Sequence, residues 1–230
     1  MKTLGLIGGT SWHSTVDYYR LLNQLVNQRL GGKNAARLIL HSLNFQEFYT
    51  DNQNGGWEST ERFLIPIARQ LEEAGAEGLM LCANTPHMVA PGVQAAISIP
   101  LIHIAEATAR EIVKNGQNRV ALLGTVFTME EPFYSDILAQ HGIETLVPDK
   151  ATRDYIHETI FDEMSLGQFK HETKTEYLRI MNTLKQQGAQ GVILGCTEIP
   201  ILVKPEECPM PAYDTILIHC TAAVDFALAD

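Results

Sequence analysis

The chain has 230 residues, of which 45% are hydrophobic and 19% are charged, a composition typical of a globular protein and unlike that of a disordered one. Its 17 basic and 27 acidic residues give a formal net charge of −10. That balance argues against nucleic acid or a membrane surface as a partner, because both attract basic patches. The length allows one large domain or two lobes of ordinary size.

The amino terminus and the cysteines predict a cytoplasmic protein. Residues 1–8 enter a strand pattern at once, without the apolar core and cleavage site of a secretory signal. No run approaches the roughly 18 apolar residues of a membrane-spanning helix. The four cysteines form no CxxC pair, and without a signal peptide they are expected to be reduced thiols.

Short β-rich runs alternate with longer segments of helical period, which predicts βαβ units and a parallel sheet. Most strand candidates are continuous apolar runs, as expected where helices cover both faces of a sheet. Strands are predicted at 3–7, 37–43, 78–82, 101–104, 119–123, 142–146 and 191–195. Helices are predicted at 14–30, 58–74, 105–115, 131–140, 153–166, 174–187 and 215–229.

An internal repeat relates two halves of the chain. Residues 75–85 (GAEGLMLCANT) match residues 188–198 (GAQGVILGCTE) without a gap at an offset of 113 (188 minus 75), and Ala83 corresponds to Cys196. The repeat predicts an α/β fold of two pseudo-symmetric three-layer lobes with mostly parallel sheets. Because ligands of such sheets bind beyond the carboxyl ends of the strands, the active site is expected in a cleft between the lobes. The lobes are assigned to residues 1–100 plus 210–230, and to residues 101–209.

Cys196 is the strongest candidate for a catalytic residue. It follows the predicted strand 191–195 and precedes a predicted helix at 198–203, so it would lie at a helix N-terminus. The N–H groups and the positive end of the helix dipole there favour the thiolate and lower the thiol pKa from about 8.5. Such a thiolate can act as a base or a nucleophile. The alternative is a buried structural cysteine, and the duplication favours the catalytic role.

Three further segments at predicted strand ends offer hydrogen-bond donors. Residues 84–86 (NTP) form a helix start by themselves, and their donors could also hold a substrate carboxylate. Residues 8–10 (GGT) and 124–128 (GTVFT) end two corresponding strands of the repeat. Neither segment fits GxGxxG or GxxxxGK[ST], so a nucleotide cofactor is disfavoured.

The histidines and Cys82 carry weaker signals. The sequence has no HExxH motif and no close pairing of histidine with cysteine, so no metal site is expected. His87 is expected on the solvent side of its helix, and His219 in packing or capping. Cys82 is expected to point into the packing if Ala83 faces the cleft, because adjacent strand residues point to opposite faces.

Together the motifs resemble the aspartate/glutamate racemase superfamily, and especially its bacterial amino-acid racemases. The resemblance covers essentially the whole chain. It rests on residues 5–12 (GLIGGTSW), 82–87 (CANTPH), 122–125 (LLGT) with Thr128, 195–198 (GCTE), and Asp214 and Thr215 with His219.

The resemblance implies a racemase that uses neither pyridoxal phosphate nor a metal. In the family, one of two cysteines removes the α-proton as a thiolate and the other returns a proton on the opposite face. Donors around the substrate carboxylate must then stabilise a carbanion-like transition state. By resemblance, Cys196 is one of these cysteines and the protein is a homodimer. The resemblance assigns substrate binding to Thr10, Asn52, Asn84, Thr85, Thr125, Thr128 and Thr197.

Two departures from the family pattern shape the functional prediction. Ala83 replaces the first family cysteine, and Ser165 replaces a basic residue found in some aspartate-specific members. We expect an isomerase that acts on an amino acid, impaired by Ala83, with Cys82 as a possible second proton donor. Two alternatives remain: a decarboxylase of the same superfamily that uses one cysteine, and a non-catalytic binder of amino or dicarboxylic acids.

Overall fold

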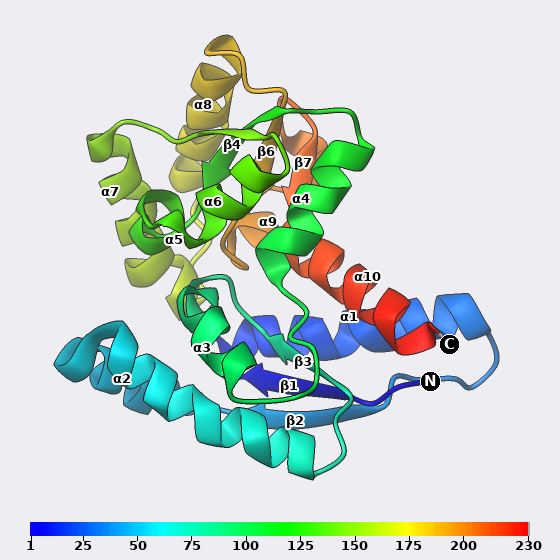
Figure 1. The fold of residues 1–230 in the computed structure, drawn as a ribbon. Coiled ribbons are helices and arrows are strands. Elements are labelled where there is room, and N and C mark those ends of the chain that lie inside the picture. Colours follow the sequence, from blue (N-terminus) through cyan, green and yellow to red (C-terminus); the bar gives the residue numbers. More distant parts are fainter. Residues whose placement is uncertain (230) are drawn as a thin grey trace. The chain divides into compact units, whose positions relative to one another are not determined.

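The computed structural model describes residues 1–229 and contains two parallel sheets with helices packed around them (Figure 1). The chain divides into unit 1, residues 1–104 with the C-terminal segment from His219, and unit 2, residues 105–218. It therefore crosses between the units at 104/105 and at 218/219, later than the sequence-based boundaries at 100/101 and 209/210. The predicted α/β class with parallel sheets is confirmed.

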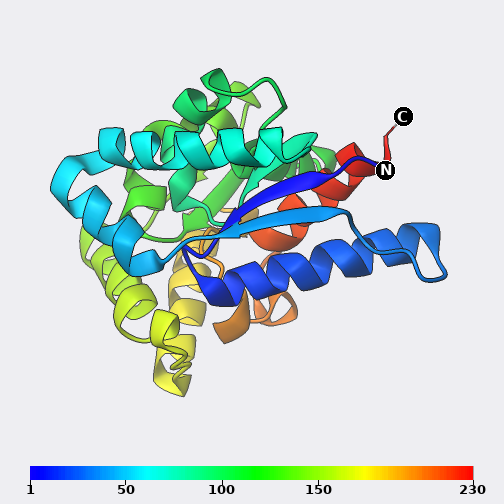
Figure 2. The same cartoon turned by 90° about the horizontal axis from the view of Figure 1, so that it is seen from below.

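Unit 1 holds a three-stranded sheet in the order β2-β1-β3. Helix α1 covers one face of this sheet and α2 covers the other (Figure 2). The elements of this part of the chain are β1 (Leu4–Gly8), α1 (Trp12–Leu30), β2 (Leu38–Ser42), α2 (Phe45–Glu73), β3 (Gly78–Leu81), η1 (Thr85–Val89) and α3 (Ala90–Ala95). Helix α10 (Thr215–Leu228) starts in unit 2 and returns to unit 1.

Unit 2 holds a four-stranded parallel sheet in the order β5-β4-β6-β7. Its strands are β4 (Arg119–Leu123), β5 (Glu144–Leu146), β6 (Gly191–Leu194) and β7 (Ala212–Asp214). Its helices, apart from the start of α10, are α4 (Ile104–Lys114), α5 (Val126–Glu130), α6 (Pro132–Gln140), α7 (Lys150–Asp162), η2 (Met164–Leu166), α8 (His171–Gln186), α9 (Ile199–Leu202) and η3 (Pro205–Glu207).

The sequence repeat is also a structural repeat. Strand β3 pairs with the central strand β1 in unit 1, and β6 pairs with the central strand β4 in unit 2. In these pairings Gly78 lies opposite Leu4, and Gly191 lies opposite Val120. Both repeated motifs therefore follow a strand that neighbours the centre of its sheet.

Side chains alternate between the two faces of the unit 2 sheet, and those on one face form a single apolar cluster. Val192 and Leu194 of β6 pack with Ala121 and Leu123 of β4 in one cluster. That cluster also contains apolar side chains of α7 and α8, such as Ile156. The strand residues between them, Leu122 and Ile193, are buried as well. Successive strand residues point to opposite faces of the sheet, and helices cover both faces.

Several predicted elements differ from the observed ones, and two of the differences have a clear local reason. Residues 101–104 do not form a strand: only Leu101 makes an isolated parallel bridge, to Leu79, because helix α4 already begins at Ile104. The helix predicted from residue 58 begins at Phe45 instead. Gly56 interrupts it with φ 63° and ψ −159°, a conformation that glycine adopts without strain. The predicted start at residue 58 lies directly after this interruption.

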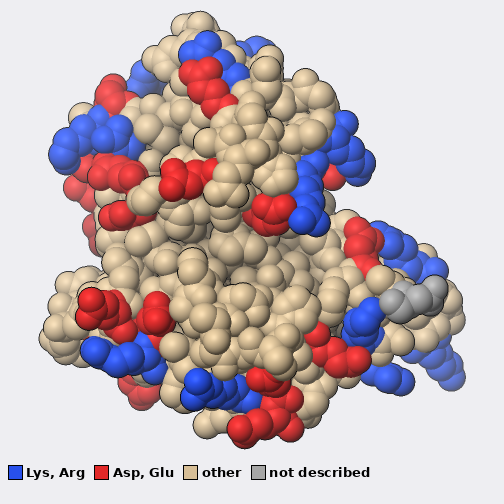
Figure 3. All heavy atoms as spheres, in the orientation of Figure 1, with Lys and Arg blue, Asp and Glu red and all other residues tan. Residues whose placement is uncertain are grey.

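Among the described helices, none is both long enough and apolar enough to cross a membrane. On the face of each unit drawn in Figure 3, acidic and basic side chains are interspersed.

Candidate active site

The loop that carries Cys196 packs backbone to backbone against the end of β4. Gly195 N–H donates to the Leu123 carbonyl at 2.6 Å. A Cβ atom at Gly195 would lie 2.8 Å from that same carbonyl oxygen, and one at Gly124 would lie 2.9 Å from the Gly195 carbonyl oxygen. Only glycines allow this approach, which brings the residues after β4 next to the residues after β6.

Four predicted site residues lie in this part of unit 2, which we call the unit 2 cluster: Thr125, Thr128, Cys196 and Thr197. Thr125 caps helix α5, and its hydroxyl oxygen accepts from the Thr128 N–H at 3.3 Å and lies 3.2 Å from the Thr128 hydroxyl oxygen. Thr125, Thr128 and Thr197 are all buried. The cluster thus contains three buried threonines and one partly buried thiol.

The Cys196 thiol is held by a carboxylate that the sequence analysis did not single out. Its S–H donates to Oε2 of Glu198 at 3.0 Å, and the Thr197 hydroxyl donates to the same oxygen at 2.7 Å. Glu198 is 6% exposed. Its position two residues after the cysteine in GCTE was the available signal, but sequence spacing alone does not show that the two side chains meet.

The predicted lowering of the Cys196 pKa is wrong. Desolvation by burial raises the pKa of the thiol well above its usual value, and the negative charge of Glu198 and its hydrogen bond raise it further. Helix α9 has only four residues, so its dipole is too short to offset these effects. The thiol is therefore a proton donor at rest, and its thiolate would be a strong base.

The corresponding residues in unit 1, which we call the unit 1 cluster, are Thr10, Ala83, Asn84 and Thr85. Thr10 follows Gly9, which has φ 89° and whose Cβ, if present, would lie 2.2 Å from the Leu43 carbonyl oxygen. The Thr10 hydroxyl oxygen is buried and has no hydrogen-bond partner among residues 1–229. Since a buried hydroxyl normally has a partner, this one is available for a ligand.

Asn84 occupies the N-cap position of the 3-10 helix η1, as the helix-start motif predicts, with Pro86 in the first turn, but its side chain makes no capping hydrogen bond. Ala83, directly before it, is partly buried and carries only a methyl group. Cys82 is 1% exposed, and burial raises the pKa of its thiol above the usual value. These observations agree with a packing role for Cys82 and give no support to it as a second proton donor.

Asn52 lies on α2 just before the interruption at Gly56. Its side-chain amide donates to the buried Thr60 hydroxyl at 2.9 Å, and Asp51 accepts in parallel from the Ser59 hydroxyl at 2.9 Å. These two hydrogen bonds bridge the two parts of α2. One N–H of the Asn52 amide is therefore already used inside the helix.

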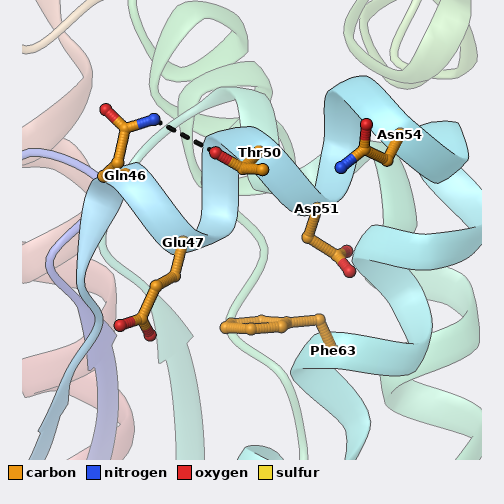
Figure 4. A pocket seen from close by; sticks show the side chains of 6 residues that line it. All are labelled: Gln46, Glu47, Thr50, Asp51, Asn54 and Phe63. Atoms are coloured by element: carbon orange, nitrogen blue, oxygen red, sulfur yellow. Dashed lines mark hydrogen bonds between the residues drawn. The ribbon is translucent and has the colours of Figure 1, made fainter.

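A pocket of about 420 Å³ opens beside the first part of α2 (Figure 4). None of the predicted site residues lines it. The lining residues are Gln46, Glu47, Thr50, Asp51, Asn54 and Phe63.

The expectation that His87 faces solvent is wrong, since its side chain is 0% exposed. Its Nδ1 lies 2.9 Å from the Ala83 carbonyl oxygen. His219 is also 0% exposed, and its ring nitrogens lie 2.9 Å from the Tyr18 hydroxyl and 2.6 Å from the Ile102 carbonyl oxygen. Of the two roles expected for His219, packing or capping, its burial fits packing.

Comparison with known proteins supplies the context for these two clusters. Residues 7–223 match the Asp/Glu/Hydantoin racemase family. The chain is 26% identical to the broad specificity amino-acid racemase RacX of Bacillus subtilis over 175 residues, which cover 75% of this chain and 74% of that protein. It is 27% identical to a glutamate racemase of Staphylococcus aureus over 193 residues, which cover 79% of this chain and 70% of that one.

Solved structures give the same result. A Yersinia pestis protein classed with the Asp/Glu racemases matches with a TM-score of 0.94 and 43% identity over 100% of both chains. PH1733, an aspartate racemase homologue from Pyrococcus horikoshii, matches with a TM-score of 0.87 and 36% identity, again over 100% of both chains. The chain belongs to the Asp/Glu/Hydantoin racemase family.

Proposed function

We propose that this protein is a cofactor-independent amino-acid racemase in which the Cys196 thiol transfers a proton at the α-carbon of the substrate. The observation that carries the proposal is the contact of 3.0 Å between the Cys196 sulfur and Glu198. Together with burial, this contact keeps the thiol protonated at the end of β6, the strand beside β4. Membership of the family and the similarity to amino-acid racemases support the reaction class.

Proton donation by Cys196 breaks its S–H bond and forms the Cα–H bond of the product. The thiolate left behind lies beside the Glu198 carboxylate, whose negative charge disfavours it. Because a base becomes stronger as the pKa of its conjugate acid rises, this thiolate is suited to remove an α-proton in the reverse direction. Glu198 thus makes the Cys196 thiol a weaker acid and its thiolate a stronger base.

The neutral donors of the two clusters are proposed to bind the substrate. The α-proton of an amino acid is far less acidic than a thiol, so the negative charge that develops on the substrate needs preorganised donors. The buried Thr10 hydroxyl supports this assignment in unit 1, and the buried Thr125 and Thr128 side chains support it in unit 2. The proposed substrate-binding residues are Thr10, Asn52, Asn84, Thr85, Thr125, Thr128 and Thr197.

Ala83 makes the proposed reaction asymmetric. A methyl group carries no transferable proton, so inversion requires water or a hydroxyl to act on the face opposite Cys196. Proton exchange on the Cys196 face needs only the minor thiolate form of Cys196, which takes the α-proton as S–H, exchanges it with solvent and returns a solvent proton to the same face. We therefore infer that exchange with solvent is faster than inversion of configuration.

Deuterium incorporation tests the proposal directly. The protein is incubated with each enantiomer of a panel of amino acids in deuterated water, and α-deuteration and enantiomeric composition are measured by NMR and chiral chromatography. Incorporation into at least one substrate, with slower inversion, supports the proposal. No incorporation into any substrate of the panel contradicts it.

The alanine at position 83 also favours a second candidate, a decarboxylase that needs only one thiol. Loss of carbon dioxide from a substituted malonate would generate the carbanion, and Cys196 would protonate it on one face. Release of carbon dioxide from a malonate without α-deuteration of amino acids would select this candidate. A rise in melting temperature with amino or dicarboxylic acids, with neither reaction, would indicate a binding protein.

We also propose that the protein is a homodimer. Trp12, Val16 and Tyr19 recur at helical spacing on α1 and are 64%, 57% and 58% exposed, and exposed apolar groups of this kind often mark protein contacts. Sedimentation equilibrium gives the mass in solution. Replacing Tyr19 by Glu should shift it to the monomer.

A further inference from the structure

His87 joins three backbone groups of unit 1. Its Nδ1 lies 2.9 Å from the Ala83 carbonyl oxygen and 3.2 Å from the Asn84 carbonyl oxygen. Its Nε2 lies 3.3 Å from the Ile104 nitrogen. Ile104 is the first residue of α4 and the last residue before the chain crosses to unit 2.

These contacts determine the protonation state of the ring. Carbonyl oxygens can only accept, so the Nδ1 that faces them must carry a hydrogen. The backbone N–H of Ile104 can only donate, so the Nε2 that faces it must be unprotonated. The ring is therefore neutral and has a single tautomer. Burial lowers its pKa well below the usual value, and His103 and His219, whose rings lie 4.6 Å and 5.7 Å away, lower it further.

The ring also sets the direction of two peptide groups. In a trans peptide the N–H points opposite to the C=O of the same plane. The Ala83 carbonyl shares its plane with the Asn84 N–H, and the Asn84 carbonyl shares its plane with the Thr85 N–H. Because both carbonyls point at His87, both N–H groups point away from it.

We propose that His87 is a positioning residue, which orients the Asn84 and Thr85 N–H groups toward the substrate carboxylate by holding the Ala83 and Asn84 carbonyls. The role at the substrate rests on the proposed function. The fixed tautomer of His87 does not, and it can be tested without any turnover. His87 touches no substrate in this scheme and acts only through the backbone of the unit 1 cluster.

NMR of the protein labelled with ¹⁵N-histidine tests the tautomer. Long-range ¹H–¹⁵N correlations separate an Nδ1–H ring from an Nε2–H ring, and spectra of the His87→Gln variant assign the signal. We expect His87 to remain an Nδ1–H tautomer from about pH 8 to about pH 5. An Nε2–H tautomer, or protonation within that range, would overturn the proposal whether or not the protein is a racemase.

Two substitutions separate the two contacts of the ring. Asparagine can place an N–H near the Nδ1 position and so keep the contact with the carbonyls, while glutamine can place an acceptor near Nε2 and keep only the contact with Ile104. In the deuterium assay we expect His87→Gln to lower kcat/KM by about 100-fold, as misplacement of binding groups does. We expect His87→Asn to recover most of this loss.

The exposed residue His171, on α8, provides the matched control. Its substitution by Gln should leave kcat/KM unchanged. Equal losses for His87→Asn and His87→Gln at similar melting temperatures would overturn the positioning role. Full native activity in His87→Gln would overturn it as well.

Discussion

Oε2 of Glu198 accepts a hydrogen bond from the Cys196 sulfur at 3.0 Å and another from the Thr197 hydroxyl at 2.7 Å. The two bonds fix the carboxylate next to the thiol, in a place that is almost fully buried. An ionised carboxylate at this distance opposes the thiolate by direct repulsion, which water screens little in a buried site. Burial raises the pKa of the Cys196 thiol, and the residue two positions further along the chain raises it further.

Replacing Glu198 by Gln should lower the pKa of Cys196. The substitution removes the negative charge but keeps the shape, so the thiolate loses a repulsive neighbour and the pKa should fall by at least about 1 unit. The measurement is the rate of alkylation of Cys196 against pH, followed by mass spectrometry of its peptide. Cys208, whose pKa burial raises to about 11, serves as internal control. Glu172→Gln, at an exposed position in α8, is the control and should change the pH profile of neither cysteine. If Glu198→Gln leaves the alkylation profile of Cys196 unshifted, the carboxylate does not control the pKa of the thiol.

Replacing Cys196 by Ser should reduce deuterium incorporation by at least about 100-fold, the range that general acid–base groups contribute. A serine hydroxyl is a far weaker acid than a thiol, and it cannot supply the proton. The melting temperature should change little, because the side chains differ by one atom in a partly buried place. Cys208→Ser is the control with full activity. Retained incorporation in Cys196→Ser would remove Cys196 from the mechanism.

Replacing Ala83 by Cys should increase inversion of configuration by about 100-fold, because it supplies an acid–base group where only a methyl group stands. Chiral chromatography measures the rate of inversion, and NMR measures exchange in the same samples. Ala83→Ser is the matched control: it adds a polar atom of similar size without a thiol and should have a much smaller effect. If the cysteine and serine variants invert the substrate at the same rate, position 83 is not a second acid–base site.

The buried histidines predict a loss of stability in acid. Burial lowers the pKa of His219 from 6.5 to about 4. Between these values the unfolded chain binds a proton that the folded protein does not, so the free energy of unfolding falls as the pH falls. The loss is at most about 1.4 kcal/mol per pH unit for this residue, or about 3 kcal/mol over the whole window.

Urea denaturation at a series of pH values measures this effect. His219→Gln removes the titrating group but can keep a donor for the Ile102 carbonyl, which His219 contacts at 2.6 Å. Its free energy of unfolding should fall less steeply between about pH 6.5 and about pH 4. Parallel slopes for the native protein and the variant would mean that His219 does not contribute to acid unfolding.

Several features followed from the sequence because they depend on local patterns. The continuous apolar runs of β1, β3, β4 and β6 marked buried strands. The repeat at an offset of 113 (188 minus 75) matched Ala83 with Cys196 from residue types and spacing alone. The prediction failed where an adjacent element overrides the local pattern. Residues 101–104 are apolar enough for a strand, but α4 begins at Ile104, and only one bridge forms.

The sequence by itself determined the α/β class, the duplicated strand ends and the cysteine on which the proposed chemistry depends, because each is written in residue types and spacing. Only the tertiary structure decided that Glu198 raises the pKa of Cys196 and that His87 lies buried against Ala83. Desolvation and contacts between side chains depend on what surrounds a group in three dimensions. A helix N-terminus inferred from sequence predicts a thiolate, but burial of the thiol and a carboxylate 3.0 Å from the sulfur reverse that prediction.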